Sequence, residues 1–116
     1  MEKKHTYFVD IDGTILKYRK FETYETTKAE PIKSTINFLI DKAKEGHMII
    51  LTTARPEYLH DHTITELHEN GVPYNKIIMG IERGPRYIIN DMDPNKPEKR
   101  AISINLTRDE GIQSNS

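Results

Sequence analysis

Hydrophobic and polar positions alternate along the chain in a pattern that predicts strands separated by helices. The first apolar run, residues 7–9, ends at Asp10 and suits a buried strand. Isoleucine and leucine then recur at helical spacing from Pro31 until Gly46, and a second helix of about fourteen residues is expected to close at Asn70 and Gly71. Further apolar runs predict strands at 48–51, 77–79, 87–89 and 101–106.

The order strand, helix, strand, helix, strand favours an α/β fold with a three-layer, Rossmann-like and mostly parallel sheet. The run 48–51 is apolar without interruption, which is typical of a strand buried on both faces. Residues 15–30 are polar and lack a helical period, so we expect a loop or a small flap after the first strand.

Composition restricts the classes of protein that the chain can represent. The 116 residues suit a single domain, 1–106, followed by a tail, 107–116. Lysine and arginine number 17 against 18 acidic residues, so no basic field favours nucleic acid or a membrane surface. The chain has no cysteine, and no apolar run approaches the roughly 20 residues of a membrane span. A cytoplasmic location is therefore expected.

Polar residues gather where the predicted strands end. Asp10 ends the first strand, Thr53 follows the second, and Asp91 follows the fourth. Parallel α/β sheets bind ligands beyond the carboxyl ends of their strands, so these side chains are expected at one edge. A surface turn would explain any one of them but does not predict all three.

Two other readings of nearby residues fail on spacing. Asp10 and Asp12 could open a calcium loop, but Ile15 would then occupy the place of the invariant glycine and Phe21 that of the bidentate glutamate. His60 and His62 lie two residues apart on a predicted helix, where their side chains point in nearly opposite directions. We expect these two histidines to be solvated rather than to share a metal.

Over residues 5–106 the chain resembles the haloacid dehalogenase superfamily of phosphohydrolases, in its short form without a cap domain. The family's first motif is present as Asp10, Asp12, Gly13 and Thr14. Its second motif appears as Thr53-Ala54-Arg55 and its fourth as Asn90-Asp91, in the family's order along the chain. The resemblance implies a HAD-like Rossmann fold and an open cleft.

The resemblance also implies a role for each motif residue. Asp10 would be the nucleophile that forms an aspartyl-phosphate, and Asp12 would protonate the leaving oxygen and later activate water. Magnesium would be held by Asp10, by the backbone carbonyl of Asp12 and by Asp91. Thr53 would hold a phosphoryl oxygen, and the substrate would also be bound by Gly13, Thr14, Ala54 and Arg55.

The chain departs from the family pattern at two positions. The lysine that usually follows the third strand is missing, and we expect Arg83 to replace it, with Arg86 and Arg55 as alternatives. Asn90 stands where many relatives carry a second aspartate, which removes one charge from the expected magnesium site.

The sequence therefore predicts a magnesium-dependent phosphatase acting on a phosphorylated small molecule, with sugar phosphates as a candidate class. Nucleic acid and membrane are not expected partners, and a homo-oligomer could close the open cleft. The alternative is a catalytically weak or inactive protein of the same fold that binds a phosphorylated ligand. The intact pair of Asp10 and Asp12 favours the enzyme, because binding alone does not need both carboxylates.

Overall fold

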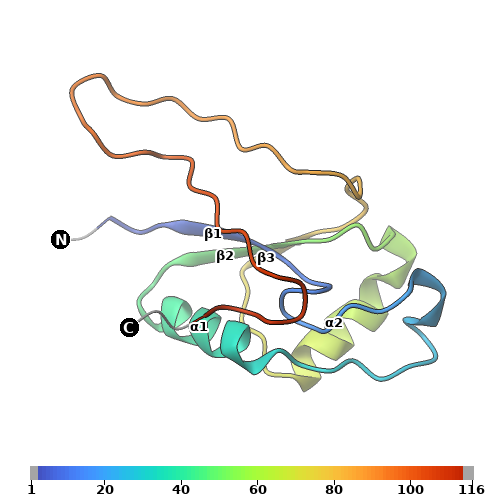
Figure 1. The fold of residues 1–116 in the computed structure, drawn as a ribbon. Helices are drawn as coiled ribbons and strands as arrows, with labels where there is room; N and C mark the ends of the chain where they lie inside the picture. Colours follow the sequence, from blue (N-terminus) through green and yellow to red (C-terminus); the bar gives the residue numbers. More distant parts are fainter. Residues whose placement is uncertain (1–2, 114–116) are drawn as a thin grey trace.

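The structure is a computed structural model that describes residues 3–113 (Figure 1). Within these residues, three strands and two helices follow one another, with two short 3-10 helices between them. The elements are β1 (Thr6–Asp10), η1 (Phe21–Thr23), α1 (Lys33–Lys44), β2 (Met48–Thr52), η2 (Glu57–Leu59), α2 (His60–Glu69) and β3 (Lys76–Ile78). This is the α/β fold with a parallel sheet that the sequence predicts.

The three strands form one parallel sheet in the order β1-β2-β3. Asp10 pairs in register with Thr52, and Thr52 pairs with Ile78, so all three strands end at the same level. Each crossover between parallel strands carries one helix, and right-handed crossovers in this strand order place both helices on the same face. Figure 1 shows α1 and α2 together on one side of the sheet.

The core lies between this helical layer and the inner face of the sheet. Ile49 and Leu51 of β2 are buried in one cluster with Leu39 of α1 and Leu67 of α2. Both helices begin and end close to where the apolar spacing predicts, with η2 running directly into α2. Among the described residues, neither helix is long and apolar enough to cross a membrane.

The outer face of the sheet is not covered by residues 3–113. Side chains alternate along each strand, so Phe8, Met48 and Ile78 point away from the helices and are 52%, 39% and 45% exposed. The prediction that 48–51 is buried on both faces is wrong, because both helices lie on the inner face. The described residues thus form two layers rather than three.

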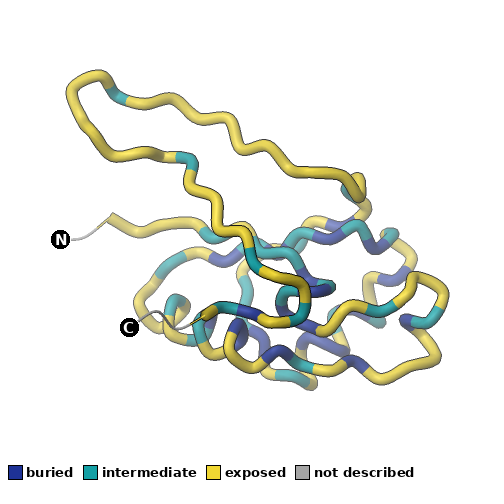
Figure 2. Tube along the Cα trace, viewed as in Figure 1, coloured by how far each residue is buried: buried dark blue, intermediate teal, exposed yellow. Residues whose placement is uncertain are grey.

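Residues 87–105 form an extended arm rather than part of the sheet (Figures 1 and 2). The strands predicted at 87–89 and 101–106 are not formed, and Tyr87, Ile89 and Ile102 are 83%, 92% and 72% exposed. An apolar run becomes a strand only when a neighbouring strand pairs with its backbone, and the described arm has no such partner. Both strand predictions are therefore wrong for this structure.

The end of the described chain is docked on the domain. The sequence predicts a tail from residue 107, but Asp109 donates its backbone N–H to the carbonyl of Gly13, 2.8 Å away. The backbone N–H of Tyr18 donates to Asp109 Oδ1 at 2.7 Å, and Gly111 is buried. Residues 107–113 consequently lie against the loop that follows β1. Residues 114–116 of the predicted tail are outside the described part of the chain.

Candidate active site

The loop after β1 carries the two carboxylates of the first motif. Ile11 lies between them and is fully buried, which anchors the loop in the core. Its carbonyl accepts hydrogen bonds from the backbone N–H groups of Thr14, Ile15 and Leu16, while Gly13 donates to the carbonyl of Leu16. Gly13 adopts a φ of +91°, a left-handed conformation that glycine tolerates best.

Asp10 lies at the sheet edge with its side chain 35% exposed. Thr14 Oγ1 donates to Asp10 Oδ2 at 3.3 Å, and Arg86 Nη1 lies 3.3 Å from Asp10 Oδ1. Burial raises the pKa of Asp10 above its ordinary value, although the charge of Arg86 offsets part of this effect. Asp10 is thus partly desolvated but retains a cationic partner.

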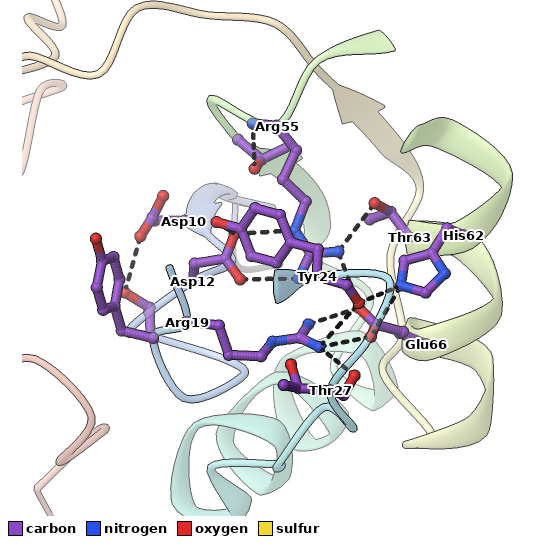
Figure 3. A network of polar contacts seen from close by, with 12 residues as sticks. Asp10, Asp12, Arg19, Tyr24, Thr27, Arg55, His62, Thr63 and Glu66 are labelled. Carbon is purple, nitrogen blue, oxygen red and sulfur yellow. Dashed lines mark hydrogen bonds and ion pairs between the residues drawn. The ribbon is translucent and has the colours of Figure 1, made fainter. Parts of the chain in front are cut away.

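Asp12 is held by a buried arginine (Figure 3). Arg55 Nε donates to Asp12 Oδ2 at 2.9 Å and Arg55 Nη2 donates to Asp12 Oδ1 at 2.8 Å, which is a bidentate pair. The same guanidinium donates through Nη1 to Thr63 Oγ1 at 3.0 Å and to Glu66 Oε1 at 2.9 Å. Burial alone lowers the pKa of Arg55, but its hydrogen bonds to Asp12 and Glu66 outweigh burial and raise it.

The role predicted for Arg55 therefore needs correction. Its side chain is 0% exposed and its guanidinium is engaged by Asp12, Thr63 and Glu66. Arg55 borders the cleft, but the structure makes it a partner of Asp12 rather than a free group for the substrate. The sequence pattern Thr-Ala-Arg could not distinguish these roles.

Arg19 and Tyr24 of the flap after β1 complete this polar network (Figure 3). Arg19 donates to both oxygens of Glu66, at 2.9 Å and 2.8 Å, and its side chain is only 9% exposed. Tyr24 donates its O–H to Asp12 Oδ2 at 3.1 Å, and the Arg55 guanidinium carbon lies 4.3 Å from the centre of the Tyr24 ring. Burial and the nearby charge of Asp12 raise the pKa of Tyr24 to about 12.

Glu66 is the residue of this network that sequence reasoning missed most clearly. Burial by itself raises the pKa of Glu66, but hydrogen bonds from Arg19 and Arg55 outweigh burial and hold it below the ordinary value. A signal was present, because Glu66 follows Thr63 by three residues and precedes Leu67 on the buried face of α2. His62 was predicted to be solvated, yet its Nε2 lies 2.8 Å from the carbonyl of Tyr24.

A cleft of about 490 Å³ opens beside the first-motif loop. It brings together almost every predicted site residue, including Thr53, whose Oγ1 accepts the backbone N–H of Arg55 at 3.0 Å. The cleft is lined by Asp10, Asp12, Gly13, Thr14, Tyr18, Tyr24, Thr53, Ala54, Arg55, Arg83, Arg86, Leu106 and Arg108. Arginine side chains outnumber the two aspartates, so the cleft is suited to an anion.

Asp91 is the predicted site residue that the structure does not bring to this cleft. Its side chain is 77% exposed and lies 3.9 Å from Arg100 in the arm. The physical reason is that residues 87–89 do not join the sheet, so Asp91 does not follow a strand that ends beside Asp10. Within residues 3–113, no group of three or more histidine, aspartate or glutamate side chains is arranged to hold a metal ion.

A magnesium ion can nevertheless be held by one or two carboxylates when water and a substrate phosphate complete its shell. The carboxylate of Asp10, partly exposed at the cleft, suits that kind of site. Both carboxylate oxygens of Asp12 already accept hydrogen bonds from Arg55. The group that Asp12 can offer to the ion is therefore its backbone carbonyl. The residues present therefore fit an ion that the substrate helps to bind.

Comparison with known proteins identifies the family of this chain. The family model for haloacid dehalogenase-like hydrolases matches residues 7–81, which contain the first two motifs and, apart from Thr6, the three strands. The chain belongs to the haloacid dehalogenase-like hydrolases. A hydrolytic function follows from this membership.

One solved structure supports the fold of this haloacid dehalogenase-like chain. It is the crystal structure of a protein from Vibrio cholerae, with a TM-score of 0.53 and 22% sequence identity. The match covers 73% of this chain and 79% of the other. A search of the curated proteins finds no match. The family and the fold are thus identified, whereas the substrate has to be argued from the cleft.

Proposed function

We propose that this haloacid dehalogenase-like hydrolase is a magnesium-dependent phosphatase that cleaves a phosphomonoester through an aspartyl-phosphate on Asp10. The observation that carries the proposal is the meeting of Asp10, Asp12 and Thr53 in one arginine-lined cleft at the sheet edge. Carboxylates alone would repel an anionic phosphate, and the arginines offset that repulsion.

Asp10 is the group placed to attack phosphorus. One carboxylate oxygen would form the bond to phosphorus while the bond to the ester oxygen breaks, leaving a mixed anhydride. Arg86 and the Thr14 hydroxyl already contact its two oxygens and fix the carboxylate at the cleft. Magnesium bound by Asp10 and the carbonyl of Asp12 would supply a counter-charge to the phosphate.

Asp12 has two tasks that require opposite protonation states. As an ionised group it removes a proton from the water that hydrolyses the aspartyl-phosphate, and as a neutral acid it protonates the departing alcohol. The bonds from Arg55 and Tyr24 hold Asp12 as an acceptor, which is the state that water activation needs. Among the described residues, Asp12 Oδ1 accepts only the bond from Arg55 Nη2, so this oxygen keeps a lone pair for the proton that would pass to the departing alcohol.

The remaining groups bind the phosphoryl oxygens. Thr53 lines the cleft and would donate its hydroxyl proton to a phosphoryl oxygen, and Arg83 would supply the positive charge that the missing lysine would carry. We keep phosphorylated small molecules, with sugar phosphates as one candidate class, as the proposed substrates. Closure of the cleft by a second copy of the chain remains a proposal of the same kind.

The test is hydrolysis of an aryl phosphate by the purified protein with Mg²⁺. Asp10→Asn should reduce kcat by at least about 1,000-fold, because the amide is a poor nucleophile. Asp41→Asn is the matched control, since Asp41 is exposed on α1 away from the cleft, and it should keep full activity. A chelator should also abolish turnover. Equal activity of wild type and Asp10→Asn would refute the mechanism.

A second function has an observation in its favour. Both first-motif carboxylates are engaged by arginines, and Asp91 lies outside the cleft, as expected of a protein that binds a phosphorylated ligand without cleaving it. Such a protein would bind an aryl or sugar phosphate in the presence of chelator and release no phosphate with Mg²⁺. Measured phosphate release that depends on Asp10 excludes this alternative.

A further inference from the structure

We infer that the substrate carries a second anionic group besides its phosphate, and that Arg108 binds this group. The inference rests on the proposed phosphatase function and narrows its substrate class. Suitable substrates are phosphomonoesters that also carry a carboxylate or a second phosphate. Three observations lead to this class: the positive charge of the cleft, the fixed backbone beside Arg108, and the contact of its guanidinium with the Tyr18 ring.

The charges of the cleft do not cancel internally. Asp12 is neutralised by Arg55, and Asp10 is contacted by Arg86. Arg83 and Arg108 also line the cleft, yet within residues 3–113 neither forms an ion pair with a carboxylate. Positive charge therefore exceeds what the aspartates of the cleft require, and this excess favours an anionic ligand.

A phosphoryl group next to Asp10 does not need to contact every arginine of the cleft. The phosphoryl group next to Asp10 can be bound by Arg86, which already reaches that carboxylate, and by Arg83. Arg108 comes from the opposite end of the chain and lies against Gly13, where a Cβ would be 3.2 Å from its Cγ. Its charge is then available to another part of the same substrate.

The docked turn fixes the backbone beside Arg108, whose exposed side chain lines the cleft. Asp109 donates its backbone N–H to the carbonyl of Gly13, and its carboxylate accepts the backbone N–H of Tyr18. Gly111 of the same turn is buried, has a φ of +73° and lies against Ser34 and Thr35 of α1. A side chain fixed by its neighbours loses less entropy on binding than a free surface arginine does.

The stacking of Arg108 favours recognition of a planar anion. Its guanidinium carbon lies 4.0 Å from the centre of the Tyr18 ring, so one face of the group is covered. A guanidinium that contacts a ring through one face keeps its N–H groups for other partners, and two of them can form parallel bonds to a carboxylate. This arrangement favours a substrate whose second anion is a carboxylate or a phosphate over one with a neutral hydroxyl.

The test compares matched substrates that differ in one carboxylate. Glycerol 3-phosphate is compared with 3-phosphoglycerate, and sorbitol 6-phosphate with 6-phosphogluconate, so that both a short and a long separation are covered. Wild type should show a kcat/KM at least about tenfold higher for the carboxylated member of one pair. Arg108→Gln should remove most of this preference, and Arg108→Lys should keep part of it.

Arg100→Gln is the matched control, because Arg100 lies in the arm beside Asp91 and does not line the cleft. It should leave the preference unchanged. Hydrolysis of both members with equal kcat/KM would overturn the subsite while the phosphatase proposal stands. A preference that persists in Arg108→Gln would overturn the assignment to Arg108.

Failure of the proposed function is recognised separately. If wild type hydrolyses none of the four compounds, their binding is measured by titration calorimetry. Tighter binding of a carboxylated compound that is lost in Arg108→Gln supports the subsite even without turnover. Equal binding of both members of each pair, or no binding at all, overturns it.

Discussion

Replacement of Glu66 by glutamine should destabilise the protein strongly, although Glu66 is not expected to touch a substrate. The side chain of Glu66 is 8% exposed and accepts hydrogen bonds from Arg19 and Arg55, whose side chains are 9% and 0% exposed. Glutamine keeps the shape and one acceptor oxygen but removes the charge. Arg55 would then keep only the charge of Asp12, and Arg19 would keep only the carbonyls of Tyr24 and Thr27.

The magnitude follows from the burial of this network. Removing one partner of a buried ion pair typically costs about 3–5 kcal/mol, because the other charge remains desolvated. Glutamine can still accept from one guanidinium, so we expect the lower end, about 3 kcal/mol. Against a total stability of roughly 5–15 kcal/mol, this loss should lower Tm by about 10 °C.

The assay is urea unfolding at pH 7 followed by circular dichroism, together with a thermal melt. Glu69→Gln is the matched control, since Glu69 lies three residues further along α2 and is exposed. This control should change the free energy of unfolding by less than about 0.5 kcal/mol. If Glu66→Gln also loses less than about 1 kcal/mol, the buried network does not stabilise the fold and our reasoning is wrong.

Two further predictions concern the same network and the docked turn. The difference in the free energy of unfolding between wild type and Glu66→Gln should be present in full above the ordinary pKa of 4.5. It should vanish as pH falls through the lower pKa of folded Glu66. Unfolding measured from pH 7 to pH 3 checks this, and a difference that grows on acidification would contradict it. Gly111→Ala should cost about 2 kcal/mol and speed amide exchange in 107–113, because its new Cβ would lie 2.6 Å from Ile32 Cγ2. Gly84→Ala, which meets no atom within 4 Å, is the control, and an equal effect of both would refute the packing argument.

Local patterns predicted the elements that carry the site. The strand before Asp10, the helix before Gly46 and the strand before Thr53 are each encoded within a few neighbouring residues. Parallel strands end at one edge, so the convergence of Asp10 and Thr53 on the cleft follows from their places after strands. The family motifs are continuous in sequence for the same reason.

Local patterns failed where a partner distant in the chain decides the outcome. Residues 87–89 and 101–106 have the apolar content of strands, but no strand pairs with them in the described structure. The alternation in β2 was hidden by its apolar run, because hydrophobic residues occupy the exposed face as well. Asp91 is therefore placed in the arm, away from Asp10.

The sequence by itself determined the order of the elements, the two carboxylates after the first strand and the family. Only the tertiary structure decided what surrounds those carboxylates, because the partners are far apart in the chain. Arg55 is 43 residues from Asp12, Arg19 is 47 residues from Glu66, and Asp109 is 91 residues from Tyr18. No local period encodes such pairs, since each forms only when the packing of helices, flap and docked turn brings the charged groups together out of water.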